Sequence, residues 1–295
     1  MLCAYGGFAE QSEGESVMKK LLTKRQRVIL GKVCFYLFLV VVLIFTLFPF
    51  LWMILAAFKT NAQVTDPTQL FIFKPYFGNF STVFQRYDFI RPIINSFIVA
   101  LFSTLLGLLL GLPAAYSIAR SGRTKTSLLI LVVRFFPGIA FMLPWYIIFS
   151  KLGITDSYLA LILSHMLINV PFIVWVMIPY FESIPRELED AAKMDGCRTM
   201  TAFLRVVLPL TGPGLITTSL LSAIFSWNNF LFSLILAGGN TRTVPLALLS
   251  FVSYASIDWG AMMAAAVVIT LPILVISLFA QKYIIAGLTA GAVKG

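Results

Sequence analysis

The residues whose types and spacing could do chemistry lie between positions 182 and 212. The acidic and small side chains of this stretch are Glu187, Glu189, Asp190, Ala191 and Ala192. Ser183 and Pro185 favour a helix start just before them, and Gly196 lies where a helix needs a left-handed stop. Carboxylates at the positive end of a short helix, beside alanines that allow close approach, suit charge-assisted docking to a basic partner.

A second short helix is expected directly after the first. Its apolar side chains recur at helical spacing at Met200, Phe203, Leu204 and Val207. We expect Thr199 to cap this helix and Leu208-Pro209 to end it. Two interpretations of the pair stay open: an amphipathic hairpin that lies on the membrane surface, or a docking element for a cytoplasmic partner.

The chain carries no nucleotide-binding motif of its own. Its only Gly-Lys pair is Gly31-Lys32, with Gln26 where a P-loop requires glycine. His165 is the sole histidine, which excludes a His-Glu-x-x-His site. The cysteines, widely spaced and in no metal or redox pattern, are Cys3, Cys34 and Cys197. We therefore expect no catalytic residue, no bound metal and no cofactor in this chain.

Polar side chains inside the apolar runs are the second group that could contact a substrate. Four of them follow i, i+4, i+8 and i+11 of one helix: Thr218, Ser222, Ser226 and Asn229. Such a stripe either hydrogen-bonds a neighbouring helix or lines a translocation cavity. Asn228 is a further candidate. Asn169 and His165 lie one turn apart, and both helix packing and pathway lining stay open for them.

Other residues of the apolar runs bear on helix packing. Gly107 and Gly111 form a G-x-x-x-G pair that allows two helices to approach closely. Arg134 is expected either to reach the inner interface along its aliphatic stem or to pair with another subunit or with helix-end carbonyls. The prolines that should kink their helices are Pro137, Pro144 and Pro171.

The composition indicates the elements that must position these residues. Hydrophobic residues make up 59% of the 295-residue chain and charged residues 12%, whereas soluble domains have roughly 25% charged residues. Six uncharged runs each supply the ~20 residues that cross a bilayer, where backbone groups must be paired within the segment. We therefore predict an all-α integral membrane protein with six transmembrane helices, whose cores are 34–56, 93–117, 127–149, 158–180, 214–236 and 261–280.

The distribution of Lys and Arg predicts the orientation of these helices. With a cytoplasmic N-terminus, fifteen Lys and Arg fall in inner segments and six in outer ones, so both termini are expected inside. This bias explains the net charge of +10 without a nucleic-acid partner. The first apolar run is too long for a cleaved signal peptide, which is the alternative interpretation.

The predicted order of segments follows from the spans. Residues 1–17 precede Met18, a plausible alternative start. The segments are an N-terminal segment 1–32, a first helix 33–58, an external loop 59–91, a core domain 92–281 with an inner loop 182–212 and an external loop 237–260, and a cytoplasmic tail 282–295.

The inner loop resembles the EAA loop of binding-protein-dependent ABC importer permeases. That pattern is Glu-Ala-Ala, three residues, Gly, nine residues and Ile-x-Leu-Pro. The chain matches its spacing with Asp190-Ala191-Ala192, Gly196 and Val206-Val207-Leu208-Pro209. Asp190 stands for Glu and Val206 for Ile. Asp is one methylene shorter than Glu, and the neighbouring Glu189 is able to compensate in a salt bridge to the ATPase.

Further stretches resemble the MalG-type permeases of maltose transporters, in the carbohydrate branch of this family. Trp227-Asn228-Asn229-Phe230 is similar to a Trp-Asn-Glu-Phe stretch, with Asn229 in place of Glu. Asp258-Trp259-Gly260 and the tail from Gln281 to Gly295 resemble the ends of these subunits. The resemblance covers essentially residues 33–295.

The resemblance implies a fold and a set of partners. The chain would adopt the ABC type I importer permease fold in a prokaryotic cytoplasmic membrane and pair with a sister permease of the MalF type. Each EAA loop would fit a cleft in one of two cytoplasmic ATPase subunits, which use ATP and Mg. The tail would reach the ATPase interface. The residues expected at the ATPase are Glu187, Glu189, Asp190, Ala191, Ala192, Gly196, Leu208 and Pro209.

The resemblance also implies a cargo. An external binding protein would deliver a sugar, either a mono- or an oligosaccharide, and the loop 238–256 would reach into that protein. The loop residues expected there are Gly238, Gly239, Asn240 and Thr241. The candidate residues of the substrate pathway are Ser222, Ser226, Asn228, Asn229 and Asn169.

Two other classes of protein fit the sequence less well. An ion-coupled secondary transporter needs carboxylates within the membrane, and every Asp and Glu here lies in an expected tail or loop. A membrane enzyme needs a catalytic constellation, and none is visible in the sequence.

Overall fold

The computed structural model describes residues 24–122, 124–254 and 256–290, and its regular elements there are helices. The chain divides into two units between Leu55 and Ala56. Nearly all of the helix α2, Lys24–Ala57, belongs to the first unit, and it supplies a candidate span, Val28–Ala57, that is strongly apolar and exposed over most of its length. A helix that is hydrophobic all round is suited to lipid or to burial against another protein.

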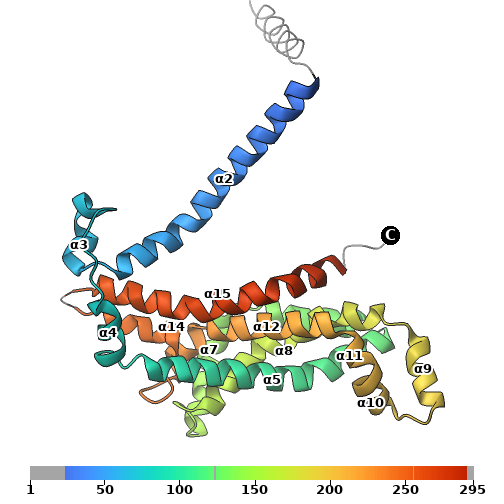
Figure 1. Cartoon of the computed structure of the whole chain (residues 1–295). Coiled ribbons are helices and arrows are strands. Elements are labelled where there is room, and N and C mark those ends of the chain that lie inside the picture. The colour runs from blue at the N-terminus through green and yellow to red at the C-terminus, as the bar shows by residue number, and fades with distance from the viewer. Residues whose placement is uncertain (1–23, 123, 255, 291–295) are drawn as a thin grey trace, which may run out of the picture. The chain divides into compact units, whose positions relative to one another are not determined.

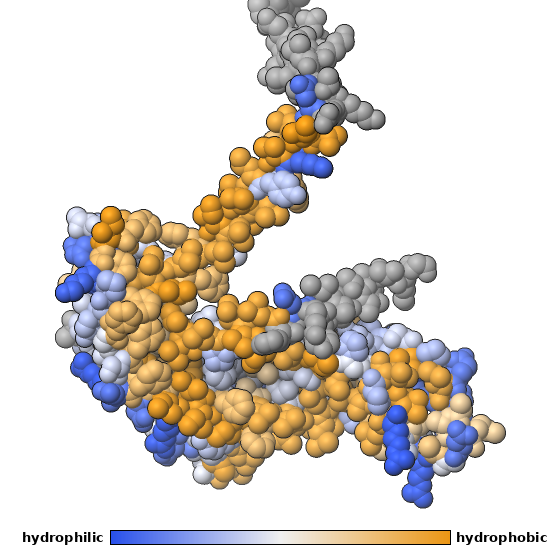
Figure 2. Space-filling view, viewed as in Figure 1, coloured by the Kyte–Doolittle hydropathy of each residue, from blue (hydrophilic) through white to orange (hydrophobic). Residues whose placement is uncertain are grey.

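The second unit is built on α5, Ile90–Ser121, and α8, Tyr158–Ser183, which lie side by side (Figure 1). Both are long and apolar enough to cross a membrane, as is Trp259–Leu278 of α15, Trp259–Ala290. A core of aliphatic and aromatic side chains, centred on Ile173 and Phe181, fills the space between α5, α8 and the residues after α9. Figure 2 shows a broad apolar surface on this unit, with hydrophilic residues gathered towards its ends.

The contact between α5 and α8 depends on the G-x-x-x-G pair. A Cβ atom added at Gly111 would lie 2.7 Å from Cγ2 of Ile173, and one at Gly107 would lie 3.0 Å from Cδ1 of the same residue. Only glycine fits this approach without displacement of the neighbour. The prediction that the pair allows close helix packing is therefore confirmed within the chain.

The span predicted at 127–149 is not one continuous helix. The structure has α6, Thr124–Phe135, and α7, Gly138–Lys151, with a break at Phe136 and Pro137. Pro137 has no N–H to donate and its ring clashes with the preceding turn, so the helix stops there instead of merely kinking. Neither helix alone is long enough for a candidate span.

The span predicted at 214–236 is also interrupted. Helix α12, Gly212–Trp227, stops just before Asn228, and the next helix, α13, is Leu231–Leu236. The asparagine side chains at the break bond locally: Nδ2 of Asn228 donates to the Ile224 carbonyl at 3.0 Å, and Oδ1 of Asn229 accepts from the Phe232 N–H at 3.1 Å. The Asn229 bond satisfies an N–H group that an uninterrupted helix would pair internally, and the Asn228 bond adds to the helical bond that the Ile224 carbonyl already accepts from the Asn228 N–H.

Counted by length and composition, four helices of the described residues are candidate spans. A fifth results if the bent pair Thr199–Leu210 and Gly212–Trp227, which meet at 84°, is taken as one. Helix α15 continues past Gln281 to Ala290, so the boundary predicted between core and tail is not a helix end. Residues 1–23 and 291–295 lie outside the described residues, as do the side chains of Arg134 and of 282–290.

Short helices occupy the connecting segments. The predicted external loop 59–91 holds α3, Asn61–Thr65, a 3-10 turn at Pro67–Gln69, and α4, Gly78–Gln85. The predicted inner loop holds α9, Arg186–Met194, α10, Thr199–Ala202, a π turn at Phe203–Val207, and α11, Leu208–Leu210. The last predicted external loop holds α14, Val244–Ala247, and a 3-10 turn at Leu248–Phe251.

Candidate functional site

Helix α9 is attached to the end of α5 by a buried carboxylate. Glu189 is 3% exposed and forms an ion pair with Arg120. The hydroxyl of Tyr116 donates to Oε2 of Glu189 at 2.7 Å. Nη2 of Arg186 donates to the Arg120 carbonyl at 3.0 Å, which adds a second link between the two helices. The position and tilt of α9 are therefore set from within this chain.

This arrangement corrects the expectation for Glu189. The sequence offered this carboxylate as a substitute for the shorter Asp190 in a salt bridge to an ATPase. The structure turns Glu189 inward and occupies both of its oxygens with Tyr116 and Arg120. A carboxylate already paired and buried is not available to a partner protein.

The outer face of α9 is open. Glu187, Asp190 and Ala191 are exposed, and Ala192 is half-buried. Asp190 forms an ion pair with Lys193 at 3.4 Å, and because both side chains are well exposed this pair contributes little to stability. The helix presents small and acidic side chains outward, as the sequence predicts.

The turn after α9 is confirmed and the second helix is corrected in detail. Gly196 has a φ of +86°, the left-handed conformation predicted for the helix stop. Thr199 begins α10 but does not cap it, because Arg198 holds the cap position. The helical path continues beyond Leu208 and Pro209 to Leu210, since proline is tolerated in the first turn of α11.

The underside of this loop packs on aromatic rings. Phe203 contacts Tyr116 and Phe181, with ring centroids 4.7 Å and 5.8 Å away. Phe203 also begins the π turn, in which the Leu208 N–H donates to the Phe203 carbonyl five residues back. Tyr116 thus touches both α9 and the π turn, and joins the two helical arms of the loop.

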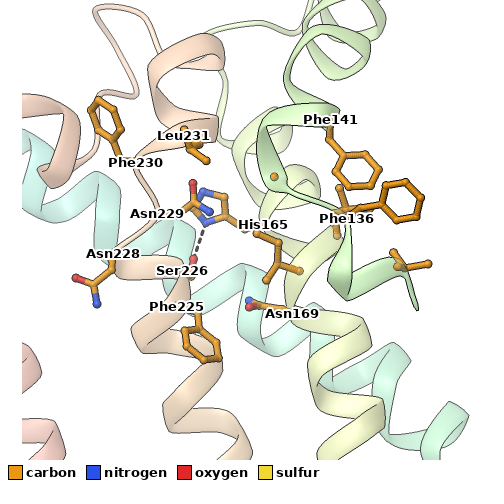
Figure 3. A pocket seen from close by; sticks show the side chains of 14 residues that line it. Phe136, Phe141, His165, Asn169, Phe225, Ser226, Asn228, Asn229, Phe230 and Leu231 are labelled. Carbon is orange, nitrogen blue, oxygen red and sulfur yellow. Dashed lines mark hydrogen bonds between the residues drawn. The ribbon is translucent and has the colours of Figure 1, made fainter. Parts of the chain in front are cut away.

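A cavity of about 550 Å³ lies beside α8 and the break after α12 (Figure 3). Four of the five predicted pathway residues line it: Ser226, Asn228, Asn229 and Asn169. The fifth, Ser222, is fully buried and is not among the lining residues. The polar stripe of α12 therefore divides, with its first turns buried in helix packing and its last turn at the cavity.

The predicted external residues Gly238, Asn240 and Thr241 form a nest around a carboxylate that sequence analysis had not singled out. The side chain of Asp156 accepts from the N–H groups of all three, at 2.8 to 3.3 Å. The Thr241 hydroxyl donates to it as well, at 2.7 Å. Gly239 and Asn240 are exposed and Thr241 is buried. These two exposed residues are the open corner of the nest, where another protein can reach the loop.

The Asp156 nest should loosen in acid. Burial raises the pKa of Asp156, but the hydrogen bonds from Thr241, Gly238 and Asn240 lower it by a larger amount. The pKa of Asp156 therefore lies below its ordinary value of 3.8. A carboxylate with a lowered pKa stabilises the folded state above its unfolded pKa and loses that contribution as the pH falls through the folded value. Amide hydrogen exchange over 237–243, corrected for intrinsic rates, should show less protection at pH 3 than at pH 6.

The matched variant is Asp156→Asn, which keeps the shape and removes the charge. It should exchange quickly at both pH values, because an amide offers one acceptor oxygen where the carboxylate offers two. Equal protection of the wild-type loop at pH 3 and pH 6 would show that the carboxylate does not hold it.

Three residues of these sites escaped the sequence analysis. Arg120 was counted only as an inner positive charge, Asp156 only as the boundary of a span, and Tyr116 not at all. Their partners lie 69, 82 and 73 residues away for Arg120–Glu189, Asp156–Gly238 and Tyr116–Glu189. The described residues hold no group of three His, Cys, Asp or Glu side chains placed to bind a metal ion.

Comparison with known proteins gives this geometry a context. Residues 107–289 match the family model described as "Binding-protein-dependent transport system inner membrane component". The trehalose transport system permease SugB of Mycobacterium tuberculosis is 36% identical over 257 residues, 85% of this chain and 93% of its own length. The trehalose/maltose permease MalG of Thermococcus litoralis is 32% identical over 292 residues, 95% and 99% of the two chains.

The fold also has a solved counterpart. A chain of a bacterial ABC transporter that imports the acidic polysaccharide alginate superposes with a TM-score of 0.73 at 21% identity, covering 89% of this chain and 99% of that one. At this level of identity the likeness concerns the fold alone.

Proposed function

This chain belongs to the family of binding-protein-dependent transport system inner membrane components, and from that premise we propose that it is the permease through which a sugar enters the cell. It is a non-catalytic, multi-pass inner-membrane subunit of an ABC importer. The observation that carries the choice of cargo is the set of relatives that match almost from end to end. They are named for trehalose, for maltose and for diacetylchitobiose.

We propose six crossings with both termini in the cytoplasm. The four long helices supply four of them, and the broken pairs α6–α7 and α12–α13 supply the other two. The excess of Lys and Arg in the segments assigned to the cytoplasm supports this orientation. It puts 182–212 and 282–295 inside, and 59–91 and 237–260 outside. Reaction of Cys197 with a membrane-impermeant thiol reagent on intact cells would contradict it.

In the proposed complex, the outer face of α9 docks into a cytoplasmic ATPase that binds ATP and Mg. Asp190 and Glu187 offer charges to basic residues there, and Ala191 allows close approach. Because α9 is fixed to α5 through Glu189 and Arg120, movement of the docked helix would be passed directly to a membrane-spanning helix. Gly196, Leu208 and Pro209 belong to the same loop and are proposed to lie at the ATPase as well, and Gly196 and Pro209 are exposed.

The remaining partners are proposed on the same basis. A sister permease of the MalF type would complete the membrane channel, and an external binding protein would deliver the sugar. The exposed Gly239 and Asn240, at the open corner of the Asp156 nest, are the contact points we propose for that protein.

The test of the function is a reconstituted complex. The permease, its sister subunit and two ATPase subunits are placed in liposomes, and the binding protein is added with trehalose, maltose or diacetylchitobiose. We expect at least one sugar to stimulate ATP hydrolysis and to accumulate inside. Failure of every mono- and oligosaccharide tested, with stimulation by a non-sugar solute, would overturn the sugar assignment.

The docking of α9 has its own test. Ala191→Trp places a large ring on the exposed face of α9, so folding should be unchanged. We expect more than tenfold less ATPase to co-purify with the tagged permease, since a bulky side chain prevents close approach. Ile72→Trp is the control, because Ile72 is 89% exposed in the loop proposed to lie outside. Full ATPase recovery with Ala191→Trp would contradict docking through this face.

A further inference from the structure

The cavity beside α8 contains a buried polar atom without a partner. His165 is 2% exposed, and its Nδ1 lies 2.6 Å from the hydroxyl of Ser226. Its other ring nitrogen, Nε2, is buried and has no hydrogen-bond partner in the described structure. Leaving such an atom unsatisfied costs about 1–3 kcal/mol. Figure 3 shows the imidazole ring in the middle of the side chains that line the cavity.

The ring is held in place from behind. Oγ of Ser226 lies 2.9 Å from Oγ of Ser103, and Nδ2 of Asn169 donates to that same Ser103 oxygen at 3.4 Å. All four side chains are buried. This network occupies Nδ1 and fixes the orientation of the ring, which lines the cavity.

The other polar groups of the cavity come from the break between α12 and α13. Nδ2 of Asn228 and Oδ1 of Asn229 are used by backbone groups nearby. The opposite atom of each amide, Oδ1 of Asn228 and Nδ2 of Asn229, carries no hydrogen bond within the described residues. The cavity therefore presents one acceptor, one donor and the imidazole nitrogen, which can serve as either.

Aromatic rings make up much of the remaining wall. The cavity is lined by Phe136, Phe141, Phe225 and Phe230. Flat apolar rings beside a few fixed donors and acceptors match the surface of a sugar, whose ring has C–H faces and a rim of hydroxyls. The volume of about 550 Å³ lies within the ~300–1,000 Å³ usual for ligand pockets.

We propose that this cavity is a sugar subsite of the permease, in which His165 Nε2 and the amides of Asn228 and Asn229 bind hydroxyls of one sugar ring while phenylalanine rings cover its C–H face. The proposal rests on the proposed import of sugars and adds that this subunit itself holds the cargo during passage. A role in helix packing alone would need neither an unpaired Nε2 nor half-used amides among the residues that line the cavity.

The decisive pair of variants is His165→Asn and His165→Gln. The asparagine amide reaches the position of Nδ1, so it keeps the bond to Ser226 and loses the group at Nε2. The longer glutamine amide reaches the position of Nε2. In the complete transporter reconstituted in liposomes, with radiolabelled trehalose or maltose, we expect His165→Asn to lower sugar uptake about threefold to tenfold. His165→Gln should retain more than half of it.

Two readouts separate a subsite from a structural role. The ATP hydrolysis stimulated by the loaded binding protein should stay within twofold of wild type in His165→Asn, so that fewer sugars enter per ATP. The matched control is Ser222→Ala, one turn from Ser226 on α12, buried and outside the cavity; its uptake should be unchanged.

The outcomes separate the two proposals. If the wild-type complex takes up sugar and His165→Asn takes up the same amount, the proposed subsite is wrong, while the proposal that the permease imports sugar still holds. An equal loss in His165→Asn, His165→Gln and Ser222→Ala also overturns it, because the cluster then serves packing alone. A wild-type complex that takes up neither sugar nor any other saccharide overturns both proposals.

Discussion

Replacing Glu189 with alanine is expected to lower the free energy of unfolding by about 3–5 kcal/mol, the usual cost of removing one partner from a buried ion pair. The side chain of Glu189 is 4% exposed and that of Arg120 is 15% exposed. Without the carboxylate, the guanidinium stays largely buried between α5 and α9 with its charge uncompensated, and the Tyr116 hydroxyl loses its acceptor. Thermal unfolding of the purified permease in detergent measures the loss.

A matched control and a compensating double variant sharpen this test. Glu187→Ala removes an exposed carboxylate of the same helix and should change stability by less than about 1 kcal/mol. Arg120→Met combined with Glu189→Met removes both charges and should recover most of the stability. A Glu189→Ala variant as stable as Glu187→Ala would show that the pair does not hold α9 in place.

The double variant also separates stability from coupling. If the ion pair serves only to hold the fold, the stable Arg120→Met/Glu189→Met protein should transport sugar normally in the reconstituted complex. We expect transport per ATP to fall instead, since flexible apolar side chains fix the angle of α9 on α5 less well than a two-point ionic contact.

Gly111→Ala is expected to have the second large effect. The new Cβ would lie 2.7 Å from Cγ2 and 3.0 Å from Cβ of Ile173, atoms near the α8 backbone that cannot turn aside. Moving α5 and α8 apart should cost about 1–3 kcal/mol, partly offset by the roughly 1 kcal/mol by which alanine favours a helix over glycine. Thermal unfolding again gives the size of the effect.

Gly107→Ala is the natural comparison, because it introduces the same methyl group one turn away. There the nearest atom is Cδ1 of Ile173, at 3.0 Å, which is the far end of a flexible side chain. We expect this variant to be near neutral. Adding Ile173→Ala to Gly111→Ala should recover part of the loss, and strictly additive effects of the two changes would contradict a direct clash.

The sequence predicted long elements well and their interruptions poorly. Hydropathy over about 20 residues locates α5, α8 and α15 correctly, because each is a single apolar run. The same average passes over the break at Phe136 and Pro137, which stay apolar while the backbone turns. At Asn228 and Asn229 the polar pattern was visible, but periodicity assigned it to a continuous helix.

The site was predicted to a similar extent. The spacing around Asp190 and Gly196 correctly indicated a short helix with a left-handed stop. Spacing cannot say which of three nearby carboxylates turns inward, since that depends on Arg120, which lies on another helix. The same holds for Asp156, most of whose hydrogen-bond donors are backbone N–H groups that carry no side-chain signature.

The π turn at Phe203–Val207 accommodates one residue more than an α-helix would need to cover the same path. Loss of a single residue from this turn would let it close as an ordinary helix, while the flanking segments keep their register and their facing. Length changes of one residue should therefore be absorbed here during evolution, whereas the same change inside α9 would rotate its outer face by about 100° away from any docked protein.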